Sequence, residues 1–121
     1  MEKLRKTPAM QKSYDLAVEI VKFSRNLIHE RKEFVLGRQI LKSGTSIGAN
    51  VAEAHGGISK ADFSAKISIA YKEGLETKYW LNLLRDSSLL AEEEFLFLLE
   101  KIDEVCRILY TILKKSRYDT Q

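Results

Sequence analysis

The sequence contains very few of the residues that break helices or cross-link a chain. Of its 121 residues, one is proline, at position 8, one is cysteine, at position 106, and most of the six glycines fall between Gly37 and Gly57. A single Cys106 excludes an intramolecular disulfide framework and fits a reducing compartment, so we expect a cytoplasmic protein. Because so few positions force a helix to end, the composition predicts an all-α fold.

Long apolar runs and a strong net charge are also missing. No apolar stretch approaches the ~18–20 residues of a membrane-spanning helix, and residues 1–10 lack the apolar core of a secretion signal, so we expect no membrane partner. The net charge of +3 is small but unevenly distributed. Residues 1–32 hold eight Lys/Arg against four Asp/Glu, and residues 88–121 hold five against seven. On charge alone, an ordinary solvated surface is the favoured interpretation, and a nucleic-acid contact is the alternative.

Apolar residues recur at helical spacing in four segments that are separated by short turns. A hydroxyl residue followed by proline, Thr7–Pro8, predicts one helix start, and Ser59 with Asp62 predicts another. The Gly56–Gly57 pair predicts a helix end. The expected helices cover about residues 8–28, 33–55, 60–85 and 91–115. Four helices with short connections predict an antiparallel up-down-up-down four-helix bundle, as a single domain over residues 1–121.

The stretch from Gln39 to Gly57 differs from the rest of the chain because it carries no charge between residues 43 and 52. Its apolar residues recur at steps of three and four, and so do its polar ones, which predicts a helix with two stripes. Gly44 and Gly48 each cost roughly 1 kcal/mol against alanine inside a helix. A helix that keeps both glycines is expected to pack closely against a neighbour, since no Cβ stands in the way.

The polar stripe raises the question of a catalytic or ligand-binding site. Glu73 and Glu76 lie near each other on the third expected helix and could form a carboxylate pair. They could also partner the polar stripe in a structural seam, which is the interpretation that we favour. The seam would then comprise Gln39, Ser43, Ser46, Asn50, Glu53, Glu73 and Glu76.

No other group of residues indicates catalysis. His29 and His55 each sit at an expected helix end, where a lone histidine more often interacts with the helix dipole than acts as a base. The sequence has no H-E-x-x-H, E-x-x-H or C-x-x-C motif, and Cys106 falls on an apolar stripe. Residues 44–48 lack the lysine of a phosphate-binding loop. We therefore expect no enzyme activity, no catalytic residues, no metal and no cofactor.

Basic residues offer a better lead. Arg31, Arg38 and Lys42 are spaced by seven and four, so they should align along one side of the second expected helix. The end of the first helix, with further cations, would lie close to them in an antiparallel pair. Such a cluster can contact phosphates through charge and hydrogen bonds. The candidate nucleic-acid-binding residues are Lys22, Arg25, Arg31, Lys32, Arg38 and Lys42.

Several helices carry more apolar surface than the interior of one bundle can absorb. Tyr79 and Trp80 lie outside the main apolar stripe of the third expected helix, and Leu75 shares a face with Tyr79. The two rings are either half-buried within the subunit or anchors of an interface, a role that suits large amphipathic rings. Exposed apolar surface predicts self-association, so Leu75, Tyr79 and Trp80 are candidate interface residues.

Short motifs in the middle of the chain carry a family resemblance. They are Thr45-Ser46-Ile47, Ala49-Asn50-Val51-Ala52-Glu53, Ser59 with Asp62-Phe63, Ile69-Ala70, and Glu73 with Glu76. With them, the chain resembles the four-helix-bundle proteins encoded within intervening sequences of 23S ribosomal RNA genes, from about Tyr14 to Leu113. The resemblance implies a small ring, commonly a homopentamer. It also implies kinship with the accessory proteins of diversity-generating retroelements, which bind nucleic acid and a reverse transcriptase, and it implies no catalytic residues.

Three functions of different classes fit these observations. The first is a non-enzymatic homo-oligomer, a pentamer by resemblance, that binds the backbone of RNA or DNA without strong sequence preference. The second is a scaffold for another protein, such as a polymerase or reverse transcriptase, with no nucleic-acid binding of its own. The third is an enzyme or ligand site along the polar seam.

Overall fold

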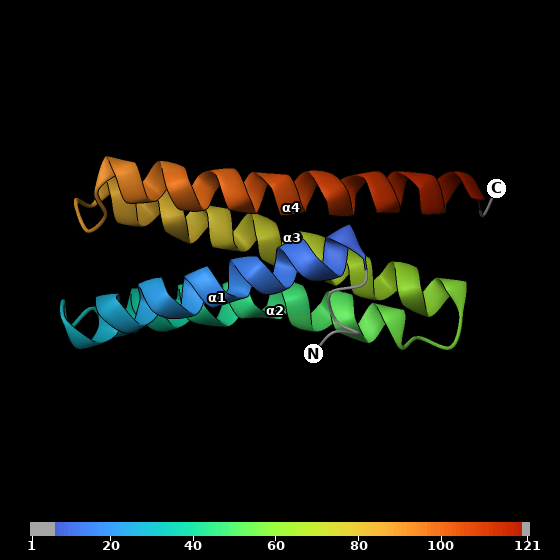
Figure 1. The fold of residues 1–121 in the computed structure, drawn as a ribbon, viewed down its shortest axis with the longest axis horizontal. Coiled ribbons are helices and arrows are strands. Elements are labelled where there is room, and N and C mark those ends of the chain that lie inside the picture. Colours follow the sequence, from blue (N-terminus) through green and yellow to red (C-terminus); the bar gives the residue numbers. More distant parts are fainter. Residues whose placement is uncertain (1–6, 120–121) are drawn as a thin grey trace.

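The structure, a computed structural model, describes residues 7–119 and the side chains of residues 7–116. Over these residues it contains the helices α1 (Pro8–His29), α2 (Phe34–His55), α3 (Lys60–Asp86) and α4 (Glu92–Asp119). Consecutive helices run in opposite directions (Figure 1). Each helix packs against its neighbours in the sequence, and α1 also packs against α4, which closes the bundle. The predicted all-α four-helix bundle is therefore confirmed.

The observed helix limits agree with the predicted ones to within a residue, except at one end. α2 begins at Phe34 because Glu33 is its N-cap. The predicted end of the last helix at residue 115 was wrong, because α4 continues to Asp119. No glycine or proline follows residue 115 to stop it, and basic residues near a helix end stabilise the helix without terminating it. Residues 1–6 and 120–121 of the predicted domain lie outside the described residues.

Side-chain and glycine signals at three helix ends behave as predicted. Thr7 Oγ1 accepts a hydrogen bond from the backbone N–H of Met10 at 3.1 Å, which caps α1. Ser59 Oγ accepts one from the backbone N–H of Asp62 at 3.0 Å, which caps α3. Gly56 follows the last residue of α2, but its φ of −94° is ordinary, so no left-handed residue ends this helix. These local signals explain why the limits could be predicted.

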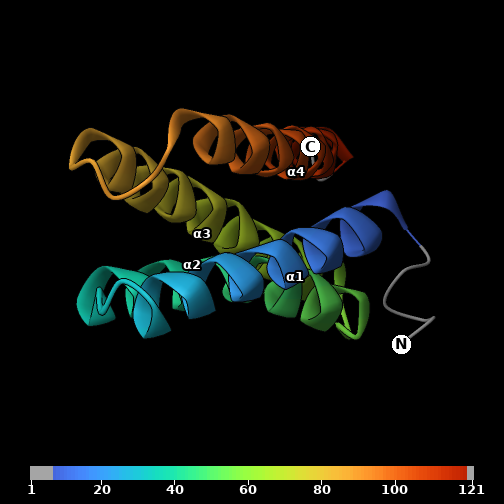
Figure 2. The same ribbon diagram turned by 60° about the vertical axis from the view of Figure 1, so that its left-hand side comes forward.

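The core is built from apolar side chains that every helix contributes. α3 runs obliquely between α4 and the α1–α2 pair (Figure 2), and it packs against α2 and α4. Within each helix the buried residues recur at steps of three and four, as an amphipathic helix requires. The largest fully buried side chains are Leu16, Ile20, Leu27, Ile40, Ile47, Ile67, Leu81, Leu84, Phe95, Leu98, Ile102 and Leu109.

α1 and α2 approach each other closely at two glycines of α2. A Cβ at Gly44 would lie 2.7 Å from Cγ2 of Ile20, which is fully buried. At Gly48 the neighbour is the backbone of α1, because a Cβ there would lie 3.3 Å from the carbonyl oxygen of Ser13. The close packing predicted from these two glycines is therefore confirmed, and α1 is the helix that approaches.

α2 and α3 are joined inside the bundle by a buried pair of hydroxyl groups. Ser43 and Thr77 are both fully buried, and their side-chain oxygens are hydrogen-bonded at 2.9 Å. Thr77 Oγ1 also lies 2.8 Å from the backbone oxygen of Glu73, and Ser43 Oγ lies 3.4 Å from that of Ile40. Each hydroxyl thus has partners, so neither incurs the cost of an unsatisfied buried polar group.

We expect Gly44→Val to lower the free energy of unfolding by roughly 1–3 kcal/mol, because the new side chain overpacks a site that Ile20 fills. Urea denaturation followed by circular dichroism measures the loss. Gly56→Ala is the control, since its new Cβ would meet only the backbone oxygen of Glu53, at 3.6 Å, and should change stability by less than about 0.5 kcal/mol. An unchanged midpoint for Gly44→Val would contradict the close approach of the two helices.

A double-mutant cycle tests the buried hydroxyl pair. Ser43→Ala and Thr77→Val should show a coupling free energy of about 0.5–1.5 kcal/mol, because either change removes the same hydrogen bond. The control cycle combines Ser43→Ala with Thr111→Val, where the exposed Thr111 hydroxyl donates to the backbone oxygen of Arg107. That pair should be additive, and additivity of the first pair as well would mean that the two hydroxyls do not stabilise each other.

Candidate nucleic-acid interface

The cations predicted to bind nucleic acid are all exposed, and they gather toward the end of the bundle where α1 turns into α2. They are Lys22 and Arg25 on α1, Arg31 and Lys32 in the connection, and Arg38 and Lys42 on α2. The packing of α1 against α2 fixes how far along the bundle axis each cation lies. Gly37 lies against Ile28, and Gly44 lies against Ile20. Residues 38 and 42 therefore stand beside residues 22–27. The structure thus places the helical cations at similar levels along the α1–α2 pair.

Two of these cations have no carboxylate partner. Within residues 7–116, neither Arg25 nor Arg38 forms an ion pair. The guanidinium carbon of Arg38 lies 5.7 Å from the centroid of the Phe34 ring, which leaves its N–H groups available. Lys22 Nζ lies 3.9 Å from Glu19 Oε1, at the outer limit of an ion pair. Exposed cations of this kind can meet a phosphate without first breaking a strong contact.

Arg31 and Lys32 belong to the turn between α1 and α2. Arg31 Nη1 donates to the backbone oxygen of Leu89 at 3.3 Å, so this turn lies against the connection between α3 and α4. Lys32 has a φ of 60°, a left-handed conformation that is uncommon outside glycine. The backbone N–H of Glu33 donates to the carbonyl oxygen of Leu27 at 3.1 Å, which holds the turn closed. Both cations are thus carried on a defined backbone.

Lys42 differs from the arginines because acidic groups of α3 lie near it. The pKa of Glu73 is raised mainly because burial disfavours its charged form, and the negative charge of Glu76 raises it further. The positive charge of Lys42 acts in the opposite direction and lowers the pKa of Glu73. Within residues 7–116, neither carboxylate forms a hydrogen bond with the polar stripe of α2. The charge of Lys42 is therefore partly offset, which leaves the arginines as the stronger anion ligands.

The rest of the predicted polar seam mostly bonds within its own helix. Ser46 Oγ and Asn50 Nδ2 each donate to the backbone oxygen four residues earlier, at 2.7 and 2.8 Å. Glu53 forms an ion pair with Lys66 of α3 at 3.1 Å, and Gln39 is exposed. Sequence reasoning missed the buried partner of this stripe, the hydroxyl of Thr77. A lone hydroxyl in the apolar stripe of α3 is the signal that could have indicated it.

The candidate interface residues of α3 point in different directions. Leu75 and Tyr79 are 46% and 60% exposed, whereas Trp80 packs against the core. The rings of Tyr79 and Trp80 meet edge to face, with centroids 5.1 Å apart. The indole N–H of Trp80 is buried and has no acceptor among the described side chains and backbone. Leu75 and, on α4, Tyr110 line the same depression of about 480 Å³, together with the charged residues Lys78, Asp103 and Arg107.

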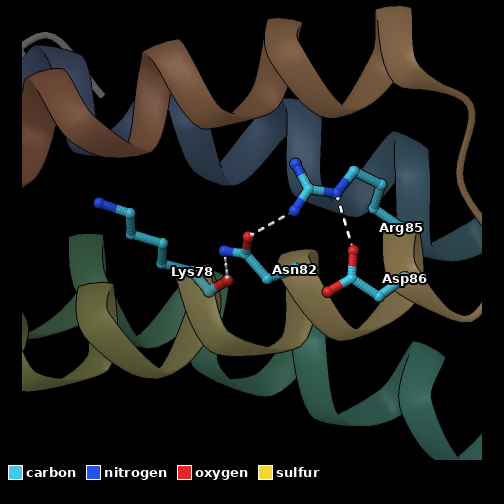
Figure 3. A network of polar contacts seen from close by, with 4 residues as sticks. All are labelled: Lys78, Asn82, Arg85 and Asp86. Atoms are coloured by element: carbon cyan, nitrogen blue, oxygen red, sulfur yellow. Dashed lines mark hydrogen bonds and ion pairs between the residues drawn. The ribbon is translucent and has the colours of Figure 1, made fainter.

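Polar contacts link four residues in a stripe along α3 (Figure 3). Asn82 Nδ2 donates to the backbone oxygen of Lys78 at 2.8 Å, and Arg85 Nη2 donates to Asn82 Oδ1 at 3.3 Å. Arg85 Nε also pairs with Asp86 Oδ1 at 3.0 Å. Lys78 Nζ lies 2.8 Å from Asp103 Oδ1 of α4. Sequence reasoning missed this stripe, although its spacing of four and three between residues 78 and 85 could have shown it.

Chemically reactive side chains stand apart from one another. Among the described residues, no group of three or more His, Cys, Asp or Glu could hold a metal ion. Burial raises the pKa of the Cys106 thiol, and the nearby charge of Asp103 raises it further, so the thiol stays protonated at neutral pH. His55 Nε2 lies 3.4 Å from the hydroxyl of Thr7, and its ring meets the edge of Phe63. None of the helices, over the part described, is long and apolar enough to cross a membrane.

Comparison with known proteins agrees with the fold. The model of the family described as 23S rRNA-intervening sequence protein matches residues 5–111. The chain is also similar to the crystal structure of a protein of unknown function from the S23 ribosomal protein family of Bacteroides thetaiotaomicron. The two are 44% identical, with a TM-score of 0.85, over 86% of this chain and 96% of that one. No curated protein matches. The resemblance inferred from the central motifs is confirmed, and the chain belongs to the 23S rRNA-intervening sequence protein family.

Proposed function

We propose that this chain is a non-enzymatic cytoplasmic protein that binds the phosphate backbone of RNA or DNA without strong sequence preference. One observation supports this most: Arg25 and Arg38 stand exposed on adjacent helices and form no ion pair within residues 7–116. Lys22, Arg31 and Lys32 extend the positive surface around them. Guanidinium groups offer both charge and directed N–H donors to phosphate oxygens. Contacts of this kind carry no sequence information.

The proposal includes self-association, as a pentamer by resemblance to the family. It is supported by large apolar side chains that α3 and α4 leave exposed. These are Ile69, Leu75, Tyr79, Leu96, Phe97 and Tyr110. Apolar surface of this extent commonly marks an interface between proteins. A ring would also repeat the basic surface, so that several weak phosphate contacts act together on one strand.

A second candidate function is supported by the same apolar surface. In this alternative, Leu75, Tyr79 and Tyr110 bind a different protein, such as a polymerase or reverse transcriptase. The cations of α1 and α2 would then only keep the surface solvated, and the chain would bind no nucleic acid itself. Capture of a partner that survives nuclease treatment, by a chain that binds no RNA, would favour this alternative.

Salt dependence tests the phosphate contacts. We expect a short single-stranded RNA to bind at about 50 mM salt, with an affinity that falls as salt rises by a log–log slope of about −0.7 per phosphate contacted. The double variant Arg25→Gln/Arg38→Gln should bind more weakly, and its slope should be shallower by about 1.4, since two contacts are lost. Fluorescence anisotropy of labelled RNA measures both quantities.

The matched control is Lys114→Gln/Lys115→Gln, which removes the same charge from exposed positions near the C-terminal end of α4. It should leave the slope unchanged, because these lysines lie at the opposite end of the bundle from the turn between α1 and α2 (Figure 1). Equal effects of the two double variants would mean that net charge acts alone. Absence of binding by the native chain at about 50 mM salt would refute the proposal.

Light scattering on nuclease-treated protein tests the assembly. We expect a mass several times that of one chain at micromolar concentration, and a smaller mass for Tyr79→Glu, because a buried unpaired charge opposes association. Gln11→Glu places the same carboxylate at an exposed position of α1 and should leave the mass unchanged. A native chain that remains a monomer at these concentrations would show that the apolar surface does not drive self-association.

A further inference from the structure

A groove on the outer face of the α1–α2 pair lies on the same two helices as Arg25, Arg38 and Lys42, which we call the basic cluster. Its lining residues are Met10, Tyr14 and Ala17 of α1 and Thr45, Gly48, Ala49 and Ala52 of α2. The groove encloses about 240 Å³. The hydroxyl of Thr45 donates to the backbone oxygen of Leu41 at 2.7 Å. Thr45 therefore contributes its methyl group to the groove wall. Among the residues that the structure describes, no carboxylate lines the groove, so no charge in this wall repels an anionic ligand.

Two helical stripes connect this groove to the basic cluster. On α2, residues 38, 42, 45, 49 and 52 recur at steps of four and three, so Arg38 and Lys42 share a face with Thr45 and Ala49. On α1, residues 14, 17, 21 and 25 follow the same rule, so Arg25 continues the other wall. Because the helices are antiparallel, both stripes have their cations toward the same end. The surface is therefore one strip, basic at one end and apolar at the other.

We propose that this strip binds single-stranded nucleic acid, with one unpaired base in the groove beside Tyr14 and the adjoining phosphates on Lys42, Arg38 and Arg25. This inference rests on the proposed backbone binding and adds the strand type and a base site to it. Stacking on an aromatic side chain is how proteins hold unpaired bases of any sequence. The arrangement thus keeps the lack of sequence preference while it selects against duplex.

The size of the groove supports a single base. At about 30 Å³ for each water molecule, 240 Å³ holds roughly eight waters, which is room for one base. Lys42 and Ala49 are seven helical residues apart, or about 10 Å along the axis, a distance that a base and its neighbouring phosphates can span. In a duplex the bases are stacked inside, so only the cationic end of the strip can be used.

The test fills the groove without removing a contact. Ala49→Leu adds a side chain at an exposed position of the groove wall, and Ala65→Leu makes the same change at an exposed position of α3. Anisotropy titrations compare each variant with the native chain on a single-stranded RNA and on the duplex of the same sequence. Ala49→Leu should weaken single-strand binding roughly tenfold and leave duplex binding unchanged, whereas Ala65→Leu should change neither. Tyr14→Ala should weaken single-strand binding in the same way.

Each other outcome overturns the inference in a recognisable way. If Ala49→Leu has no effect while Arg25→Gln/Arg38→Gln still weakens binding, the base site is wrong and backbone binding stands. Equal losses on single strand and duplex would likewise exclude a base in the groove. If Ala49→Leu has a lower native mass than the native chain in the absence of RNA, the groove is part of the interface between two copies of the chain and does not hold a base. Failure of the native chain to bind either nucleic acid would overturn the backbone proposal and the base site together.

Discussion

The close contact between α1 and α2 determines where the other candidate features of the molecule lie. At Gly44 the missing Cβ leaves room for Ile20, and at Gly48 it leaves room for the carbonyl group of Ser13. A shift of α2 along α1 would place larger side chains at these points, so the contact fixes the relative register of the two helices. That register sets residues 38 and 42 beside residues 22–27. The basic cluster is thus a consequence of how two glycines are packed.

The other two helices are joined by charged groups as well as by core packing. Lys78 pairs with Asp103 at 2.8 Å, and the guanidinium carbon of Arg85 lies 4.0 Å from the centroid of the Phe95 ring. These contacts lie along the seam between α3 and α4, and they leave the outer faces of the two helices to Tyr79, Tyr110 and other exposed apolar residues. Figure 1 shows α1 and α2 on one side of the bundle and α4 on the other. A strand bound along α1 and α2 and a protein bound along α3 and α4 would therefore use different faces.

Local features of the sequence were enough to predict most of the fold. At Thr7 and at Ser59, the side-chain oxygen accepts a hydrogen bond from the backbone N–H three residues later. Because the two partners are so close in sequence, the pattern alone predicts these helix starts. The end of α4 has no such local signal, and that prediction failed. The sequence also could not decide which of the side chains of Tyr79 and Trp80 is covered by the rest of the bundle. Adjacent residues point about 100° apart on a helix, and only the positions of the neighbouring helices determine which one is covered.

The candidate site was predictable in position but not in its details. Antiparallel packing was enough to expect that Arg25 would lie near Arg38, because the end of one helix must meet the start of the next. Neither arginine has a carboxylate partner within residues 7–116, and this property depends on side chains from several helices. The pairing of Ser43 with Thr77 and the volume of the groove depend on them too. These properties belong to contacts between elements. A sequence pattern within one element does not contain them.

Acidic residues lie at the same end of the bundle as the candidate cations. Glu92 to Glu94 open α4 close to Leu89, whose backbone oxygen accepts the hydrogen bond from Arg31. The tip of the bundle therefore carries both signs of charge. Since charges are screened over about 8 Å at physiological salt, Arg25 and Arg38 attract a phosphate only at short range. Attraction of this kind is local and modest, so useful affinity requires either several copies of the face or a second, apolar contact on the same strand.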